Sequence, residues 1–240
     1  MDKDEPEAYV IGWQPFLDLK IYLDSKPLIP RPETEWWTEE MLRSISRESA
    51  EVFSVVGLGL AARSATENAS ADEHLRFLDL CAGSGAIGCA ALKKLPNAQV
   101  YFGEIDPAHE STILKNIREN NLDKSRAVIK IGDLFTPFGD MQFDIIAANP
   151  PYIPTDRALP PSVADYEPPL ALRAGKDGLD VIHRIAKELS KHLAKQGVAW
   201  IECDSAHAAA ACALFEKRGF RAEIRTDQYE RPRVVVVSFP

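Results

Sequence analysis

A glycine-rich turn between an apolar strand and an alanine-rich helix constrains the fold of this chain more than any other feature. The apolar run 75–80 leads into Cys81-Ala82-Gly83-Ser84-Gly85, and the segment that follows is rich in alanine. Gly83, Gly85 and Gly88 have the GxGxxG spacing, in which glycines allow a tight turn and a close approach of the backbone to a ligand. The pattern predicts a ligand-binding turn at the carboxyl end of a buried strand.

Strands and helices alternate along most of the chain. Further strands are predicted at 98–103, 127–131, 143–148, 197–202, 220–226 and 234–239. The alternation predicts an α/β fold with a doubly wound, mostly parallel sheet. Ser205 is expected to cap the helix that ends at Gly219. The polar connection before the last strand is short, and a tight turn cannot join parallel neighbours, so that strand is expected to be antiparallel.

Three segments lie outside this alternation. Residues 16–23 alternate apolar and polar side chains, which predicts one strand of an N-terminal β-hairpin. We place the tail and hairpin in residues 1–30 and the main domain in residues 31–240. Residues 57–74 are rich in glycine, alanine and serine, and the stretch 154–178 is rich in proline, so both are expected to be long loops.

The composition limits the classes of function. Asp plus Glu number 36 against 28 Lys plus Arg, a formal charge of −8. This balance argues against a nucleic-acid substrate, because nucleic-acid-binding proteins contact phosphates with cations. The four cysteines form no CxxC pair and the five histidines no HExxH motif, so we expect reduced core thiols and no metal site. No apolar run has the length of a membrane span, and we expect no membrane partner.

The tetrapeptide Asn149-Pro150-Pro151-Tyr152 carries the clearest chemistry. It follows the strand 143–148, and open α/β sheets bind ligands at the carboxyl ends of their strands. Its prolines stiffen the loop and leave carbonyls free to accept hydrogen bonds, and the Asn149 side chain adds an acceptor. Acceptors beside the Tyr152 ring suit a planar group with an N–H₂, such as a carboxamide or the amine of adenine. A simple turn with a packed tyrosine is the alternative.

Carboxylates follow two neighbouring strands. Glu104 ends the second strand, about twenty residues after the glycine-rich turn, where an acidic side chain can bind the hydroxyls of a ribose. Asp133 and Leu134 follow the third strand, where a carboxylate and an apolar side chain can border an adenine; a plain turn is the alternative. A nicotinamide enzyme and a methyltransferase that uses S-adenosylmethionine fit these features equally well.

Taken in order, the motifs resemble those of a known family, the glutamine methyltransferases of peptide chain release factors. The resemblance runs from about Gly12 to the carboxyl terminus. The motifs that carry it are Leu28-Ile29-Pro30-Arg31-Pro32-Glu33-Thr34-Glu35, Asp79-Leu80-Cys81-Ala82-Gly83-Ser84-Gly85, Asn149-Pro150-Pro151-Tyr152-Ile153-Pro154 and Tyr166-Glu167-Pro168. The tetrapeptide alone is shared with adenine-N6 methyltransferases, whereas its combination with the Arg-Pro-Glu-Thr-Glu segment is much more specific.

The resemblance implies a seven-stranded Rossmann-like methyltransferase sheet preceded by a β-hairpin. It also implies transfer of a methyl group from S-adenosylmethionine to the glutamine of a release factor's Gly-Gly-Gln motif. The implied cofactor-binding residues are Cys81, Ala82, Gly83, Ser84, Gly85, Glu104, Asp133, Leu134 and Asn149. The implied substrate-binding residues are Arg31, Glu33, Asn149, Pro150, Pro151 and Tyr152, of which Asn149, Pro150 and Tyr152 would be catalytic.

Three departures from the family pattern matter. The helical amino-terminal domain usual in bacterial members does not precede the hairpin, Cys81 stands where glycine is common, and residues 57–74 exceed the usual connection. The first and third favour a mitochondrial matrix enzyme whose transit peptide has been removed, with the cytoplasm as the alternative. We expect a monomer.

The remaining alternatives are an adenine-N6 methyltransferase acting on DNA or RNA, a nicotinamide oxidoreductase and a cofactor-binding partner subunit without activity. The acidic charge disfavours the first. The second leaves the tetrapeptide without a purpose, and the presence of both motifs disfavours the third.

Overall fold

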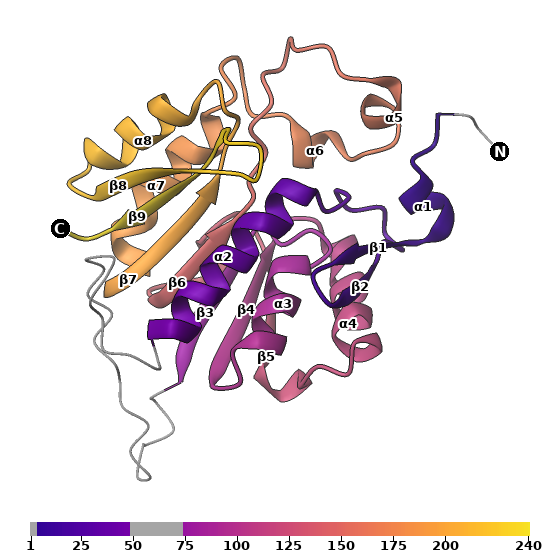
Figure 1. Cartoon of the computed structure of the whole chain (residues 1–240), viewed down its shortest axis with the longest axis horizontal. Helices are drawn as coiled ribbons and strands as arrows, with labels where there is room; N and C mark the ends of the chain where they lie inside the picture. Colours follow the sequence, from indigo (N-terminus) through magenta and orange to yellow (C-terminus); the bar gives the residue numbers. More distant parts are fainter. Residues whose placement is uncertain (1–3, 49–73) are drawn as a thin grey trace.

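A seven-stranded sheet forms the centre of the molecule. The computed structural model describes residues 4–48 and 74–240. The sheet order is β5-β4-β3-β6-β7-β9-β8 (Figure 1), and its first five strands are parallel. The strands are β3 (Leu75–Leu80), β4 (Ala98–Glu104), β5 (Ala127–Ile131), β6 (Phe143–Ala148), β7 (Leu193–Glu202), β8 (Arg221–Thr226) and β9 (Pro232–Ser238). This confirms the predicted α/β sheet.

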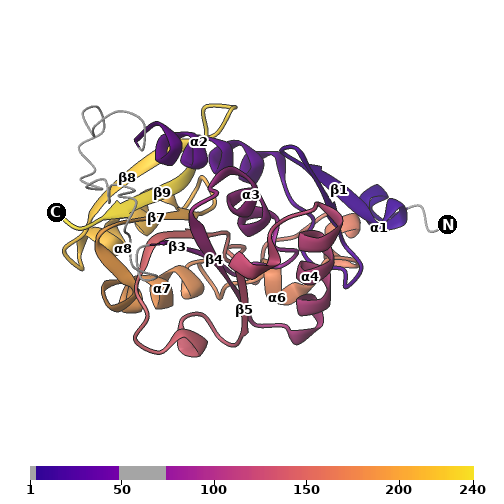
Figure 2. The ribbon, with the colours of Figure 1, turned by 90° about the horizontal axis from the view of Figure 1, so that it is seen from below.

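The last strand, β9, is antiparallel, as predicted. It runs antiparallel to both β7 and β8 and lies between them. The chain therefore completes the sheet by inserting its final strand rather than by adding an edge. Seen from below, β8 and β9 lie at one end of the molecule and the N-terminal hairpin at the other (Figure 2).

Helices cover both faces of the sheet. The main ones are α2 (Pro32–Glu48), α3 (Ala86–Lys94), α4 (Glu110–Glu119), α7 (Asp180–His192) and α8 (Ala208–Glu216), with short 3-10 turns η1 (Pro107–His109), η2 (Lys124–Arg126) and η3 (Thr136–Phe138). Alternate residues of a strand point to opposite faces. Ile145 and Ala147 of β6 accordingly join the apolar cluster under α2, α3 and α4, while Ile146 and Ala148 join the cluster under α7 and α8.

The N-terminal hairpin is present, but its first strand is not where the sequence predicts it. Helix α1 (Glu7–Ile11) precedes β1 (Trp13–Phe16), which pairs antiparallel with β2 (Leu19–Tyr22). The predicted strand 16–23 is wrong because its alternating pattern continues through the turn. Leu17 adopts a φ of 51° there, and its N–H donates to the Glu35 carboxylate of α2. A contact distant in sequence therefore stabilises the turn.

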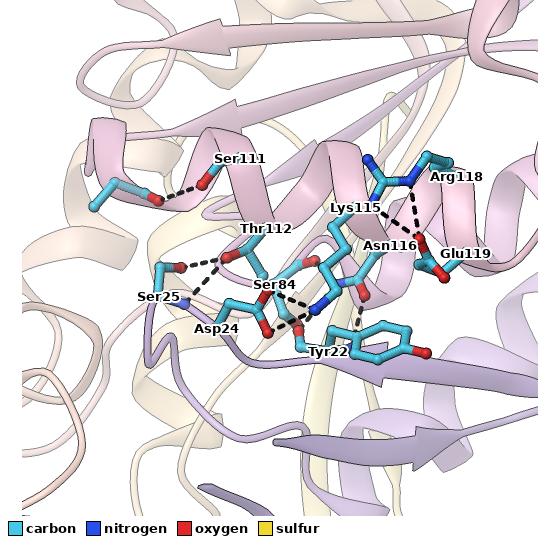
Figure 3. Close-up of polar contacts among 11 residues, drawn as sticks. Tyr22, Asp24, Ser25, Ser84, Ser111, Thr112, Lys115, Asn116, Arg118 and Glu119 are labelled. Carbon is cyan, nitrogen blue, oxygen red and sulfur yellow. Dashed lines mark hydrogen bonds and ion pairs between the residues drawn. The ribbon is translucent and has the colours of Figure 1, made fainter.

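Polar contacts attach the hairpin to α4 (Figure 3). The buried Asn116 side chain accepts a hydrogen bond from the Tyr22 N–H at 2.7 Å and donates to the Tyr22 carbonyl at 3.1 Å. It also donates to the Ser84 carbonyl in the glycine-rich turn at 2.8 Å. Nearby, the hydroxyl groups of Ser25 and Thr112 share a hydrogen bond, with their oxygens 2.7 Å apart. One side chain thus ties the hairpin to the turn expected to bind a ligand.

Several predicted boundaries need correction. Strand β7 begins at Leu193 rather than 197, with a register shift against β6. Ser205 does not cap α8: its hydroxyl donates to the Pro232 carbonyl, and α8 runs from Ala208 to Glu216. The predicted loop 154–178 contains short helices α5 (Pro161–Ala164) and α6 (Pro169–Leu172). The predicted loop 57–74 lies outside the described residues except for its last residue.

Candidate active site

A cleft opens at the carboxyl ends of β3, β4, β5 and β6. Parallel strands bring their carboxyl ends to one edge of a sheet, so residues far apart in sequence meet there. The space between its lining residues is about 870 Å³, the open mouth included. Of the predicted site residues, it is lined by Cys81, Gly83, Glu104, Asp133, Leu134, Asn149 and Pro151.

The glycine-rich turn is built from left-handed backbone. Cys81 has a φ of 64°, Gly83 a φ of 54° and Gly85 a φ of 77°. Such values favour glycine, which explains in physical terms why glycine is common at the position that Cys81 occupies. A Cβ on Gly88 would lie 2.2 Å from the Phe102 ring, so α3 packs against β4 only without a side chain there. Ala82, Ser84 and Gly85 lie behind the cleft lining.

Glu104 joins the second strand to this turn. Its carboxylate accepts hydrogen bonds from the Gly83 N–H at 2.7 Å and from the Asp106 N–H at 2.9 Å. A carboxylate offers about four lone-pair sites. Two backbone donors therefore leave room for two more, which is the number a ribose diol supplies. The residue lines the cleft, so its free acceptors are accessible to a ligand.

Asp133 and Leu134 border the cleft beside α7. The Asp133 carboxylate forms an ion pair with Arg184, which α7 contributes. Leu134 is buried and adopts a φ of 47°. Apolar side chains of Ile105 and Val181 line the same part of the cleft. An apolar wall next to a carboxylate suits a flat, largely apolar base that bears an exocyclic amine.

Two residues of the tetrapeptide after β6, Asn149 and Pro151, line the cleft. Pro150 is buried, and Tyr152 lies outside the cleft lining. Within the described residues no backbone hydrogen bond closes a turn on Asn149. The next residue, Ile153, instead donates its N–H to the Leu172 carbonyl at 2.8 Å. The loop is therefore an extension of the strand, not the simple turn that the sequence left open.

A buried carboxylate, not identified from the sequence, organises this loop. Glu202 ends β7, the neighbour of β6, and the hydroxyl of Tyr152 donates to its Oε1 at 2.9 Å. Its Oε2 accepts from the Thr34 hydroxyl and from the Trp37 indole N–H, each at 2.7 Å. Asn149 Nδ2 donates to the Thr34 oxygen at 3.1 Å. The strand-end position of Glu202 was the available signal.

Burial shifts the acidities in this cluster. Desolvation raises the pKa of Glu202, while hydrogen bonds from Thr34, Trp37 and Tyr152 act in the opposite direction. Burial and the neighbouring Glu202 carboxylate raise the pKa of the Tyr152 phenol well above its usual value. Tyr152 therefore stays a neutral hydrogen-bond donor at physiological pH.

Arg31 and Glu33 lie outside the cleft lining. Arg31 pairs with the buried Glu167 carboxylate, which also accepts from the Ile29 N–H at 3.1 Å. The Arg-Pro-Glu-Thr-Glu segment is thereby joined to the Tyr-Glu-Pro motif of the 154–178 stretch. Pro168, the last residue of the Tyr-Glu-Pro motif, and Leu28, three residues before Arg31, do line the cleft. The two motifs position one rim of the site.

Across residues 4–48 and 74–240 no group of three His, Cys, Asp or Glu side chains is arranged to hold a metal ion. No helix in this part of the chain combines the length and apolarity needed to cross a membrane.

Comparison with known proteins identifies the family. The model for the methyltransferase small domain matches residues 45–164. A release factor glutamine methyltransferase of Geobacter sulfurreducens is 34% identical over 220 residues, which cover 91% of this chain and 67% of the relative. One of Thermodesulfovibrio yellowstonii is 33% identical over 239 residues, covering 98% and 77%. This chain belongs to the release factor glutamine methyltransferase family.

Two further proteins are similar to this chain. A ribosomal protein uL3 glutamine methyltransferase of Bradyrhizobium diazoefficiens is 34% identical over 195 residues, 80% of this chain and 56% of that relative. The solved hMettl16 catalytic domain, in complex with the MAT2A 3′UTR hairpin 6, has a TM-score of 0.58 at 16% identity and covers 92% of this chain and 76% of its own. The latter similarity shows the fold alone.

Membership of the release factor glutamine methyltransferase family makes this chain a methyltransferase with S-adenosylmethionine as methyl donor, rather than a nicotinamide enzyme or an inactive subunit. The cleft fits that cofactor. Glu104 keeps free acceptors for a ribose, and Leu134 and Asp133 offer an apolar wall and a carboxylate for a base. Gly83 allows close approach of the backbone at the other end.

Proposed function

We propose that this protein transfers a methyl group from S-adenosylmethionine to the side-chain amide nitrogen of the glutamine in a release factor's Gly-Gly-Gln motif. One observation carries the proposal. Asn149 and Pro151 of the amide-binding loop line the same cleft as Glu104, Asp133 and Leu134. An amide held by the loop would therefore meet a nucleoside held by the carboxylates without any rearrangement of the sheet.

The bound cofactor would supply a methyl group on a positively charged sulfur and would leave as S-adenosylhomocysteine, which keeps the electron pair of the broken carbon–sulfur bond. The amide nitrogen would form the new bond to the methyl carbon and lose one proton to solvent. The protein has to orient the acceptor, because the lone pair of an amide nitrogen is delocalised into its carbonyl and is a poor nucleophile. Asn149 Oδ1 and the Pro150 carbonyl would accept the two N–H bonds of the glutamine, and the Tyr152 ring would cover its plane. Positioning of this kind supplies most of the rate enhancement that we ascribe to the loop.

The test is transfer of labelled methyl to four purified substrates. They are an intact release factor, the same factor with the Gly-Gly-Gln glutamine replaced, ribosomal protein uL3 and duplex DNA. We expect label on the intact factor alone. Label on uL3 would indicate that ribosomal protein as the substrate, as in the name of one relative. Label on DNA would favour the adenine-N6 alternative.

The proposal also includes the oligomeric state of the enzyme and its cellular compartment. We propose a monomer that binds no nucleic acid directly and works in the mitochondrial matrix, with the cytoplasm as the alternative. The formal charge of −8 supports the absence of nucleic-acid binding. All four cysteines are free, which suits a reducing compartment. Light scattering of the purified chain and imaging of a fluorescent fusion in cells test these points.

A further inference from the structure

With Glu202 ionised, the hydrogen-bond network around Thr34 has only one consistent direction. The Trp37 indole nitrogen can only donate, so Glu202 Oε2, which it contacts at 2.7 Å, is an acceptor. Thr34 has a single hydroxyl proton, and its Oγ1 lies 2.7 Å from Glu202 Oε2. That proton is therefore committed to Glu202. Thr34 and Glu202 are both buried, at 3% and 1% exposure, so water does not compete for it.

A committed proton leaves Thr34 with acceptor capacity only. The group that Asn149 presents to Thr34 at 3.1 Å must then be its N–H₂. Rotation of the Asn149 amide by a half-turn would place oxygen against oxygen with no proton between them. The network consequently selects one of two amide orientations of similar shape, and in that orientation Oδ1 is directed away from Thr34.

We propose that Thr34 is a positioning residue which, held by Glu202, fixes the Asn149 amide so that Oδ1 faces the substrate. The inference rests on the proposed function for its substrate, the glutamine amide, because the N–H₂ of that amide is the donor that Oδ1 would accept. Glu202 also accepts from the Tyr152 hydroxyl at 2.9 Å. One buried carboxylate therefore orients both the polar group and the aromatic ring of the loop.

The matched variants differ by one hydroxyl. Thr34→Val removes it at constant shape, and Thr34→Ser keeps it. Thr38 lies one turn further along α2, is equally buried, and its hydroxyl has no partner in the part of the chain that the structure describes. Thr38→Val is therefore the control for removing a buried hydroxyl from this helix.

We expect Thr34→Val to lower kcat about 10- to 100-fold, with KM for the release factor and Kd for S-adenosylmethionine within about twofold of the parent. Thr34→Ser should recover most of the loss, and Thr38→Val should match the parent. Because Thr34 acts through Asn149, adding Thr34→Val to Asn149→Ala should cost nothing further. A kcat for Thr34→Val within twofold of the parent, or additive losses in the double variant, overturns the proposal.

A second readout does not depend on methyl transfer. The side-chain N–H₂ signals of Asn149, assigned by their loss in Asn149→Ala, should be protected from solvent exchange in the parent and in Thr34→Ser but not in Thr34→Val. Failure of the parent to methylate a release factor would refute the proposed function. The Asn149 signals would still show whether Thr34 fixes the Asn149 amide. If Thr34→Val does not fold, Thr34→Ala replaces it in both measurements.

Discussion

Asn149 carries the proposed chemistry at the scale of a single residue. Its side chain lines the cleft, and its N–H₂ is already engaged by Thr34. Asn149→Ala removes the acceptor for one N–H of the glutamine and should lower kcat about 10²-fold or more, by analogy with the loss of one preorganised polar group. Single-turnover methylation of the release factor measures the effect, with binding of S-adenosylmethionine as the control for folding. Turnover close to that of the parent would refute the assignment.

Asp79, in strand β3 just before the glycine-rich turn, shows how burial controls protonation. Its Oδ2 accepts from the Gly88 N–H at 2.8 Å, while its Oδ1 has no partner among the described residues. Complete desolvation, together with the nearby Glu104 charge, raises the pKa of Asp79 to about 8. The carboxyl is therefore mostly protonated at neutral pH, although an unfolded chain would ionise it near pH 4.

This difference predicts a pH dependence of stability. Between the unfolded pKa of about 4 and the folded pKa of about 8, the native state keeps a proton that the unfolded state has lost. The free energy of unfolding should therefore fall as pH rises, by at most about 1.4 kcal/mol per unit from this group. Asp79→Asn, which cannot ionise, should gain stability relative to the parent between pH 5.5 and pH 8 in urea unfolding. Parallel profiles for the two proteins would contradict the raised pKa.

At the scale of elements, the hairpin is coupled to the cofactor turn through α4. Asn116→Leu would leave the Tyr22 and Ser84 carbonyls without their side-chain donor inside the protein. We expect a loss of about 2–4 kcal/mol in the free energy of unfolding, together with weaker binding of S-adenosylmethionine. Calorimetric titration and urea unfolding check both, with the exposed Ser111→Ala of the same helix as control (Figure 3). Unchanged cofactor affinity would separate the hairpin from the site.

The sequence predicts the buried strands well because parallel strands covered on both faces read as continuous apolar runs. For β3 and β6, which are buried over most of their length, the predicted and observed limits coincide. They also coincide for β5, an edge strand without a buried residue. It fails where a distant residue decides the local backbone. The apolar alternation through Leu17 hides a turn that Glu35 stabilises, and Ser205 finds Pro232 instead of a helix end. Neither partner is adjacent in sequence.

The same limit applies to the site. Residues at strand ends, such as Glu104 and Asn149, could be identified because parallel topology brings strand ends together. The contact between Thr34 and Glu202 could not be predicted from the sequence, because 168 positions separate the two residues. A threonine is also an ordinary residue for the first turn of a helix, so Thr34 alone gave no signal. Their pairing requires β7 beside β6 and α2 on the sheet face that these strands share, an arrangement that only the assembled fold provides.

At the scale of the whole molecule, the sheet depends on its final strand. Residues 234–237 of β9 are buried at 0–4% exposure and pair with both β7 and β8. Removal of residues 232–240 would leave two unpaired strand edges and an open core, so we expect loss of cooperative unfolding and of cofactor binding. Circular dichroism during heating measures this, and Tyr229→Ser, at an exposed position of the preceding turn, should behave like the parent. A cooperatively folded truncation would show that β9 is dispensable.

The central place of β9 in the sheet also has a consequence for folding during synthesis. A ribosome delivers the chain from its amino terminus, so β7 and β8 emerge with facing edges that nothing yet joins. The strand that closes this gap, β9, follows both of them in the chain. The facing edges of β7 and β8 therefore stay open until β9 has been made and can insert between them.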